Sequence, residues 1–184
     1  DSPAISVHGM GEVSYAVGPD GICRLKDLYQ SDPVRVLFPT PPRGEIPGAV
    51  FVTTSGGLVG GDLIELTATA EENVHVQMTA QAAEKIYRSN GFDSRIEVTL
   101  QAQAGSWLEW LPQETIIFDG ARLRRRTLAE VATGARMLAG EMLVLGRGAM
   151  GETVNYGLVC DDWEIRLDGR LTWADALRLD GDIA

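Results

Sequence analysis

The stretch NVHVQMT, Asn73–Thr79, decides the fold class of this chain. Its apolar residues occupy every second position, and a period of two is typical of a β-strand with one buried face. The same alternation recurs in the stretches 96–101 (IEVTLQ) and 163–168 (WEIRLD). These three stretches predict a protein made mostly of β-strands.

A strand, a turn residue and a second strand recur along the chain, with turns at Asn73, Gly105, Gly134 and Gly169. Such units bury a shared apolar face when they stack, as the units of repeat proteins do. We therefore predict a single domain over residues 1–184, all-β or mostly β with few short helices. Its expected architecture is a stack of strand-turn-strand layers that is partly β-helix-like.

Two segments have a helix-forming composition but little else in favour of a helix. Gln81–Arg88 has no convincing N-terminal cap and is barely two turns long. Ala129–Leu138 has Gly134 in its middle, where glycine costs about 1 kcal/mol relative to alanine in a helix. We expect Gly134 to lie in a turn between two strands.

Prolines indicate where regular structure is interrupted. Pro112 is expected to break or bulge the apolar stretch Trp107–Phe118. Six prolines fall between residues 18 and 48, and this region is expected to be extended and rich in loops.

The composition, with 45% hydrophobic and 23% charged residues, is that of an ordinary soluble globular protein. Its net charge of −10 argues against a nucleic-acid partner, because phosphate binding depends on clustered Lys and Arg. We interpret the one basic cluster as a solvated strand edge or turn. It consists of Arg122, Arg124, Arg125 and Arg126.

The expected location is cytoplasmic. No apolar stretch approaches the roughly 20 residues of a membrane span, and the first residues have no signal-peptide pattern. Cys23 and Cys160 are too few for a disulfide scaffold, so a reducing compartment is the simpler interpretation, with one disulfide left open.

Four glycines crowd into the stretch TTSGGLVGGD, Thr53–Asp62. A phosphate-binding loop requires a lysine after its last glycine, and Asp62 stands in that position and repels phosphate. Two alternatives remain for Asp62. It either binds a cation through its carboxylate oxygens or accepts hydrogen bonds from the N–H groups of a tight turn.

A second glycine motif, GRGAMG at Gly146–Gly151, follows an apolar strand and matches the dinucleotide fingerprint GxGxxG. That fingerprint needs a helix after its glycines, whereas a β-like pattern follows here. We interpret the motif as a strained strand-turn-strand connection. The alternative function is that of a small NAD-dependent or hydrolytic enzyme that uses this turn and nearby carboxylates.

Several carboxylates stand in apolar or small-residue surroundings: Glu84, Glu114 and Glu141, with Glu152 directly after the second glycine motif. Burying such groups costs free energy unless they are paired or hydrated. They either form structural ion pairs or line a wet internal passage for a cation. With two His and two Cys in the chain, we expect no closed zinc site and no tightly bound cofactor.

Four blocks of sequence together resemble the urease accessory protein family UreD, called UreH in some bacteria. They are TTSGGLVGGD, TAQAAEKIYRS (Thr79–Ser89), LEWLPQETIIFDGARL (Leu108–Leu123) and LGRGAMGE (Leu145–Glu152). The family usually runs on past the point where this chain stops, so we expect the chain to lack the family's C-terminal segment.

The resemblance implies a non-enzymatic chaperone that serves nickel insertion into apo-urease. Its implied partners are apo-urease, a UreF-like accessory protein and, through UreF, a UreG-like GTPase, with no nucleic acid or membrane among them. It also implies a water-filled passage for transient Ni²⁺, which weak carboxylate and water ligands suit better than a closed Cys/His site. The candidate passage acids are Asp62, Glu84 and Glu141, followed by Glu114 and Glu152.

Overall fold

The computed structural model describes residues 6–81, 83–147 and 151–182. Within these ranges the regular structure consists of β-strands, and no helix is present. The all-β prediction is confirmed, and the few short helices that we expected do not occur in the described part. The weak helix candidate Gln81–Arg88 instead contains a short strand, β7 (Glu84–Ile86).

The chain winds through three sheets in turn and forms a β-solenoid of about four coils. The first coil contains β4 (Gly48–Thr53) and β5 (Leu63–Ala70). The second contains β6 (His75–Ala80), β7 and β8 (Ser94–Ala102). The third contains β9 (Trp107–Trp110), β10 (Thr115–Ile117) and β11 (Arg122–Val131). The fourth contains β12 (Arg136–Ala139), β13 (Leu143–Leu145) and β14 (Tyr156–Leu167).

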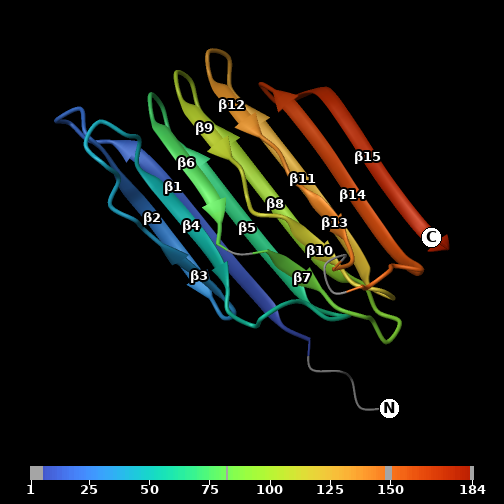
Figure 1. Cartoon of the computed structure of the whole chain (residues 1–184). Coiled ribbons are helices and arrows are strands. Elements are labelled where there is room, and N and C mark those ends of the chain that lie inside the picture. The colour runs from blue at the N-terminus through green and yellow to red at the C-terminus, as the bar shows by residue number, and fades with distance from the viewer. Residues whose placement is uncertain (1–5, 82, 148–150, 183–184) are drawn as a thin grey trace.

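Equivalent strands of successive coils pair in parallel, and Figure 1 shows them stacked side by side in chain order. Sheet A has the order β15-β14-β11-β8-β5-β1-β2, sheet B β12-β9-β6-β4-β3, and sheet C β13-β10-β7. In the first coil, Leu58 occupies the place of a sheet C strand through a parallel bridge to Ile86. The predicted stacking of strand-turn-strand layers is therefore confirmed.

Three of the four predicted turn residues connect one coil to the next. Asn73, Gly105 and Gly134 have φ angles of 60°, 70° and 82°, so the chain turns through left-handed backbone at equivalent places. A Cβ on Gly105 would lie 2.4 Å from the Asn73 side chain, because these turns stack closely. Gly169 differs, since it closes an antiparallel hairpin between β14 and β15 (Arg170–Asp182).

The N-terminal strands cover the end of the solenoid that is formed by the first coil. β1 (His8–Val17) pairs in parallel with β5, and β2 (Cys23–Ser31) pairs antiparallel with β1. β3 (Val34–Leu37) pairs antiparallel with β4. The proline-rich region is extended as expected, but it contains two strands, β2 and β3, because its prolines lie outside them.

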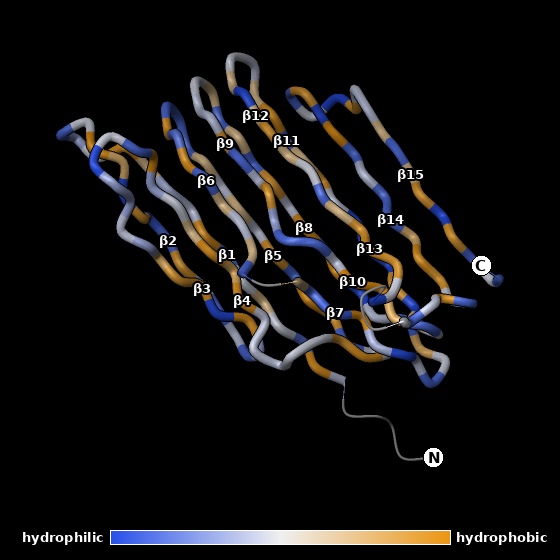
Figure 2. The backbone as a smooth tube through the Cα atoms, viewed as in Figure 1, coloured by the Kyte–Doolittle hydropathy of each residue, from blue (hydrophilic) through white to orange (hydrophobic). Residues whose placement is uncertain are grey.

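The inner faces of the three sheets form one apolar core. Figure 2 shows hydrophobic and hydrophilic residues alternating along the strands, and the hydrophobic ones of facing strands are buried. Phe51 and Trp110 pack edge to face, with their ring centroids 5.7 Å apart. As predicted, Pro112 separates two strands, β9 and β10, within Trp107–Phe118.

The interpretation of the arginine cluster as a strand edge or turn is wrong. Its residues lie in β11, which sits inside sheet A between β8 and β14. Because side chains alternate along a strand, Arg124 and Arg126 point outward while Arg125 points into the core.

Cys23 and Cys160 are both free thiols, on β2 and β14 near opposite ends of sheet A. Across residues 6–81, 83–147 and 151–182, no helix is long and apolar enough to cross a membrane.

Candidate functional site

Polar side chains cross the apolar interior of the solenoid, with at least one contributed by each coil. We call this set the polar file; it consists of Thr53, Glu84, Thr115, Arg125, Glu141 and Asp161. The stacking of coils aligns its members, because Glu84 pairs in register with Thr115 and Arg125 with Asp161. The polar file therefore runs along the solenoid axis.

The centre of the polar file is a buried cluster of three charged groups. Arg125 donates from Nε to Asp161 Oδ1 at 3.0 Å and from Nη2 to Asp161 Oδ2 at 2.5 Å. Arg125 Nη1 donates to Thr115 Oγ1 at 3.1 Å and also forms an ion pair with Glu141 Oε2. The side chains of Arg125 and Glu141 are each 4% exposed, and that of Asp161 is 10% exposed.

Burial and charge act in opposite directions on this cluster. Burial raises the pKa of Glu141, and the nearby Arg125 guanidinium offsets only part of that rise. Burial also opposes the charge on Arg125, but the Asp161 and Glu141 carboxylates outweigh it and raise the pKa of Arg125. With all three groups ionised, the cluster has one positive and two negative charges.

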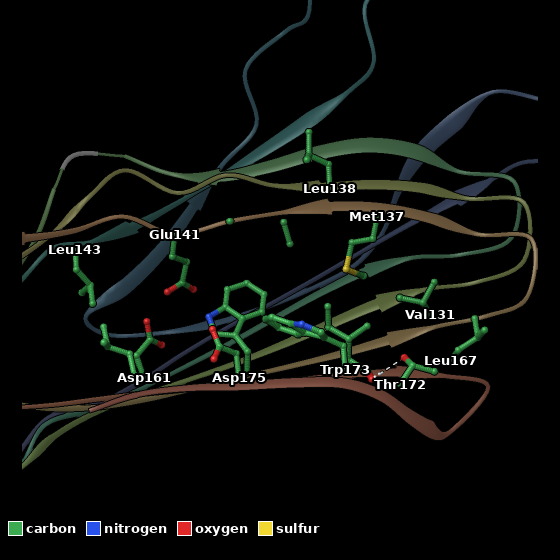
Figure 3. A pocket seen from close by; sticks show the side chains of 15 residues that line it. Val131, Met137, Leu138, Glu141, Leu143, Asp161, Leu167, Thr172, Trp173 and Asp175 are labelled. Carbon is green, nitrogen blue, oxygen red and sulfur yellow. Dashed lines mark hydrogen bonds between the residues drawn. The ribbon is translucent and has the colours of Figure 1, made fainter. Parts of the chain in front are cut away.

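Two hollows meet at Glu141. An internal cavity of about 50 Å³ lies between the sheets and is lined by Glu84, Arg125 and Glu141 among apolar side chains. An open groove of about 860 Å³ lies beside β14 and β15, and Glu141, Asp161 and Asp175 line it. In Figure 3, Glu141 points across this groove toward Asp161 and Asp175. The polar file thus leads from the interior to an open surface.

Glu84 lines the internal cavity but not the groove. Burial raises the pKa of its carboxyl, while a hydrogen bond from Thr53 opposes that rise. Glu84 reaches this position because β7 belongs to sheet C, which the chain enters between sheets B and A, and its partner residue in β10 is Thr115.

Asp62 belongs to the glycine-rich turn and lines neither hollow. Its Oδ1 accepts a hydrogen bond from Val7 N–H and its Oδ2 one from Val59 N–H, both at 2.9 Å. Asp62 is buried, and Gly61 beside it has a φ of 101°. This geometry matches the turn alternative for Asp62.

Glu114 and Glu152 also lie outside the polar file. The Glu114 backbone carbonyl accepts the Glu84 N–H at 3.0 Å, and its side chain lines neither hollow. Glu152 Oε2 accepts from Arg147 Nε at 2.9 Å, and this hydrogen bond lowers the Glu152 pKa. Residues 148–150 of the GRGAMG motif lie outside the described residues, and the strand β14 follows the motif instead of a helix.

Sequence reasoning missed Arg125, Asp161, Asp175 and Thr115 as site residues. One signal was available for Arg125, because it lies two residues from Leu123 and therefore on the inward face of its strand. The pairing of Arg125 with Asp161 depends on a register between residues 36 apart, which no local pattern reveals.

The polar file offers oxygen donors rather than a closed metal site. In the part of the chain that the structure describes, no group of three His, Cys, Asp or Glu is placed to hold a metal ion. Carboxylate and hydroxyl oxygens suit a hard or borderline divalent cation that is bound weakly.

Comparison with known proteins gives consistent matches. A family model described as "UreD urease accessory protein" matches residues 8–184. The "Urease accessory protein UreD" of Magnetococcus marinus is 48% identical over 182 residues, which are 99% of this chain and 63% of the relative. That of Rhodopseudomonas palustris strain BisA53 is 49% identical over 175 residues, 95% of this chain and 61% of the relative.

A third relative, "Urease accessory protein UreD 1" of Methylobacterium radiotolerans, is 44% identical over 178 residues, 95% of this chain and 61% of the relative. The chain spans about three fifths of the length of these curated relatives.

Proposed function

Because the chain belongs to the UreD family of urease accessory proteins, we propose that it acts in urease maturation as a non-enzymatic chaperone. The family match covers nearly the whole chain, and the relatives are named for an accessory role rather than a catalysed reaction. Neither the family match nor the names of the relatives support the alternative of a small NAD-dependent or hydrolytic enzyme.

We further propose that the polar file is a passage for Ni²⁺ as cargo. The observation that supports this most directly is that Glu141 lines both the internal cavity and the open groove, so oxygen donors continue from one to the other. The internal cavity has room for a few water molecules, which can complete the coordination of a moving ion. Weak oxygen ligands let such an ion leave again.

Within this proposal the five predicted acids separate into two groups. Glu84 and Glu141 are passage acids, and Asp161 and Asp175 join them at the groove. The other three have structural partners or lie outside the polar file. These are Asp62, Glu114 and Glu152.

The proposed partners are apo-urease, a UreF-like protein and, through it, a UreG-like GTPase. The groove beside β15 favours binding of other polypeptides, because Trp173 and Leu177 line it and are exposed. Exposed apolar surface of this kind is typical of interaction sites. We propose the cytoplasm as the location, where urease is assembled in this scheme.

Co-expression with the cognate urease and accessory proteins tests the proposed function. The double variant E84A/E141A should still co-purify with the UreF-like partner while urease activation falls. E152A is the matched control, because Glu152 is a surface acid outside the polar file, and it should activate urease normally. Failure of the wild-type protein to co-purify with any urease maturation component would contradict the proposal.

A further inference from the structure

A group of arginine and aromatic side chains lies on the surface just beyond the ends of the sheet C strands. The last residues of β7, β10 and β13 are in register, so the residues that follow these strands also lie close together. The rings of Tyr87 and Phe118 have centroids 4.9 Å apart, and the Arg147 guanidinium lies 4.6 Å from the Phe118 centroid. The Arg88 guanidinium lies 5.6 Å from the Tyr156 centroid. We call these five residues the guanidinium patch.

The guanidinium patch presents positive charge to the solvent. Arg88 forms an ion pair with Asp119 at 2.7 Å, and Arg147 forms one with Glu152 at 2.9 Å. The two arginine side chains are 63% and 49% exposed, whereas their carboxylate partners are only 19% and 20% exposed. Asp119 is also turned inward to accept the Asn155 N–H at 2.8 Å. A molecule that approaches this surface therefore meets the guanidinium groups first.

Both guanidinium groups keep hydrogen-bond donors available. Each has five N–H donors, yet among the described residues Arg88 donates only from Nη2 and Arg147 only from Nε in side-chain hydrogen bonds. Stacking on an aromatic ring restrains the guanidinium plane, so less freedom is lost when a ligand binds. Two parallel N–H groups of a guanidinium match the two oxygens of a carboxylate. The patch is thus prepared to bind carboxylates.

The guanidinium patch also accounts for sequence motifs that the polar file leaves unused. Tyr87 and Arg88 come from the second of the four sequence blocks, Phe118 from the third and Arg147 from the fourth. The first block lies beneath them, because the Tyr87 hydroxyl donates to the backbone carbonyl of Gly56 at 3.2 Å. The polar file takes no residue from the fourth block. Exposed ion pairs contribute little to stability, so stability alone does not explain these arginines.

We propose that the guanidinium patch is a docking surface for an acidic segment of a partner polypeptide. Arg88 and Arg147 bind carboxylates of that segment, and the exposed rings of Tyr87 and Tyr156 pack against its apolar side chains. Arginine and tyrosine are the residues that protein interfaces favour at their centres.

Charge complementarity identifies the partner as acidic. The chain has a net charge of −10, which repels an acidic partner over most of its surface, whereas the patch attracts one. The inference rests on the proposed function in that the partner is a component of urease maturation, but it does not involve the polar file. Glu152 lies under Arg147 and is not a docking contact, so E152A retains both guanidinium groups on their rings.

Charge reversal at the patch tests the proposal. Biolayer interferometry would measure the affinity of the purified full chain for each cognate component separately, namely apo-urease, the UreF-like protein and the UreG-like GTPase. R88E/R147E should bind one of these components at least about tenfold more weakly than wild type. Wild-type binding to that component should weaken as NaCl rises from about 50 to about 500 mM, and R88Q/R147Q should depend less on salt.

R126E/R178E is the matched control, because it reverses two exposed arginines on the outer face of sheet A. Each of them also has a carboxylate partner, Glu164 for Arg126 and Asp180 for Arg178. This variant changes the net charge equally and should keep its affinity for that component within about twofold of wild type. Equal losses in the two reversal variants would overturn the proposal, since they would reflect total charge alone.

The remaining outcomes also decide the question. Unchanged affinity of R88E/R147E for every component that wild type binds would overturn the docking surface and leave the proposed function intact. Wild type that binds no component would overturn both. If a single-stranded oligonucleotide depends on the patch and no protein component does, the partner is a nucleic acid and the proposal is wrong. If R88E/R147E does not fold, R88Q/R147Q replaces it, with an expected loss of about threefold or more.

Discussion

Arg125 and Arg126 are adjacent in the sequence but lie in opposite environments. The Arg125 side chain is 4% exposed and bonds to Asp161, whereas that of Arg126 is 58% exposed and bonds to Glu164. Breaking a buried ion pair leaves an uncompensated charge in the core, while a surface pair is screened by water.

We expect R125M to lower the free energy of unfolding by about 3–5 kcal/mol in metal-free buffer. R126M should lower it by less than about 1 kcal/mol. Urea denaturation of the two variants and the wild type measures both values. Equal effects of the two substitutions would contradict the assignment of Arg125 to the core.

Glu84 provides a pH-dependent test. Burial raises its pKa in the folded protein above the ordinary value of 4.5, so the folded state holds this proton more tightly than the unfolded state. The stabilising contribution is fully present below about pH 4.5 and is lost as pH rises through the folded pKa. Each pKa unit of the rise corresponds to about 1.4 kcal/mol.

The neutral variant E84Q lacks this titration. We therefore expect the stability of wild type relative to E84Q to decrease as pH rises from about 4.5, measured by urea denaturation across a pH series. A difference that is constant with pH, or that increases, would show that the Glu84 carboxyl is not held in the interior.

At the level of individual residues, the sequence identified Glu84 and Glu141 as acids in apolar surroundings, and the structure places both at the internal cavity. It could not separate them from Asp62, because an acid that caps a turn and an acid that lines a cavity look alike locally. Arg125 was misinterpreted because four basic residues close together suggest solvent, whereas the alternation of a strand turns one of them inward.

Among the elements, the glycine-rich turn has the strictest requirements. Gly57 has a φ of 145°, and a Cβ there would lie 2.5 Å from the Tyr87 ring and 2.8 Å from the Lys85 carbonyl oxygen. Gly56 has a φ of 78° and open space around it. Position 57 therefore requires glycine for both its backbone angle and the close approach of neighbouring atoms, whereas position 56 requires it for the backbone angle alone.

We expect G57A to destabilise the protein by about 1–3 kcal/mol more than G56A, because neighbouring atoms must shift to admit the methyl group. G56A should cost about 1 kcal/mol from its backbone angle. Thermal unfolding of the pair measures the difference. Equal melting temperatures would mean that the turn does not pack against Tyr87 as described.

The long strands and their turns were predictable, because alternation over six or more residues and a turn glycine are local signals. The short strands of sheet C were not predictable. β7, β10 and β13 have three residues each, too few to show a period of two. These strands pair because the stacking of coils aligns each of them with the equivalent strand of the coil before it.

In the whole molecule, the solenoid converts a repeat along the chain into a line of side chains along its axis. Residues from successive coils meet because the parallel register places them at the same position in each coil, as with Glu84 and Thr115 or Arg125 and Asp161. Stacked layers were predictable from the recurring turns, but the polar file was not, since register between coils is a tertiary property.

The fourth coil is followed by a strand that belongs to sheet A alone. β15 extends sheet A beyond β14, while β12 and β13 end sheets B and C, and the groove lies where these edges meet. Glu141 therefore lies at the boundary between the interior and the open end of the solenoid.

Nickel content of urease tests the central claim most directly. Apo-urease would be activated with purified accessory proteins that contain wild type, E84Q/E141Q or the surface control E152Q, and the nickel bound to re-isolated urease measured by mass spectrometry. We expect E84Q/E141Q to bind its partners but deliver no more nickel than a reaction without this protein, while E152Q equals wild type. Full nickel loading by E84Q/E141Q would contradict the account of the polar file as a nickel passage.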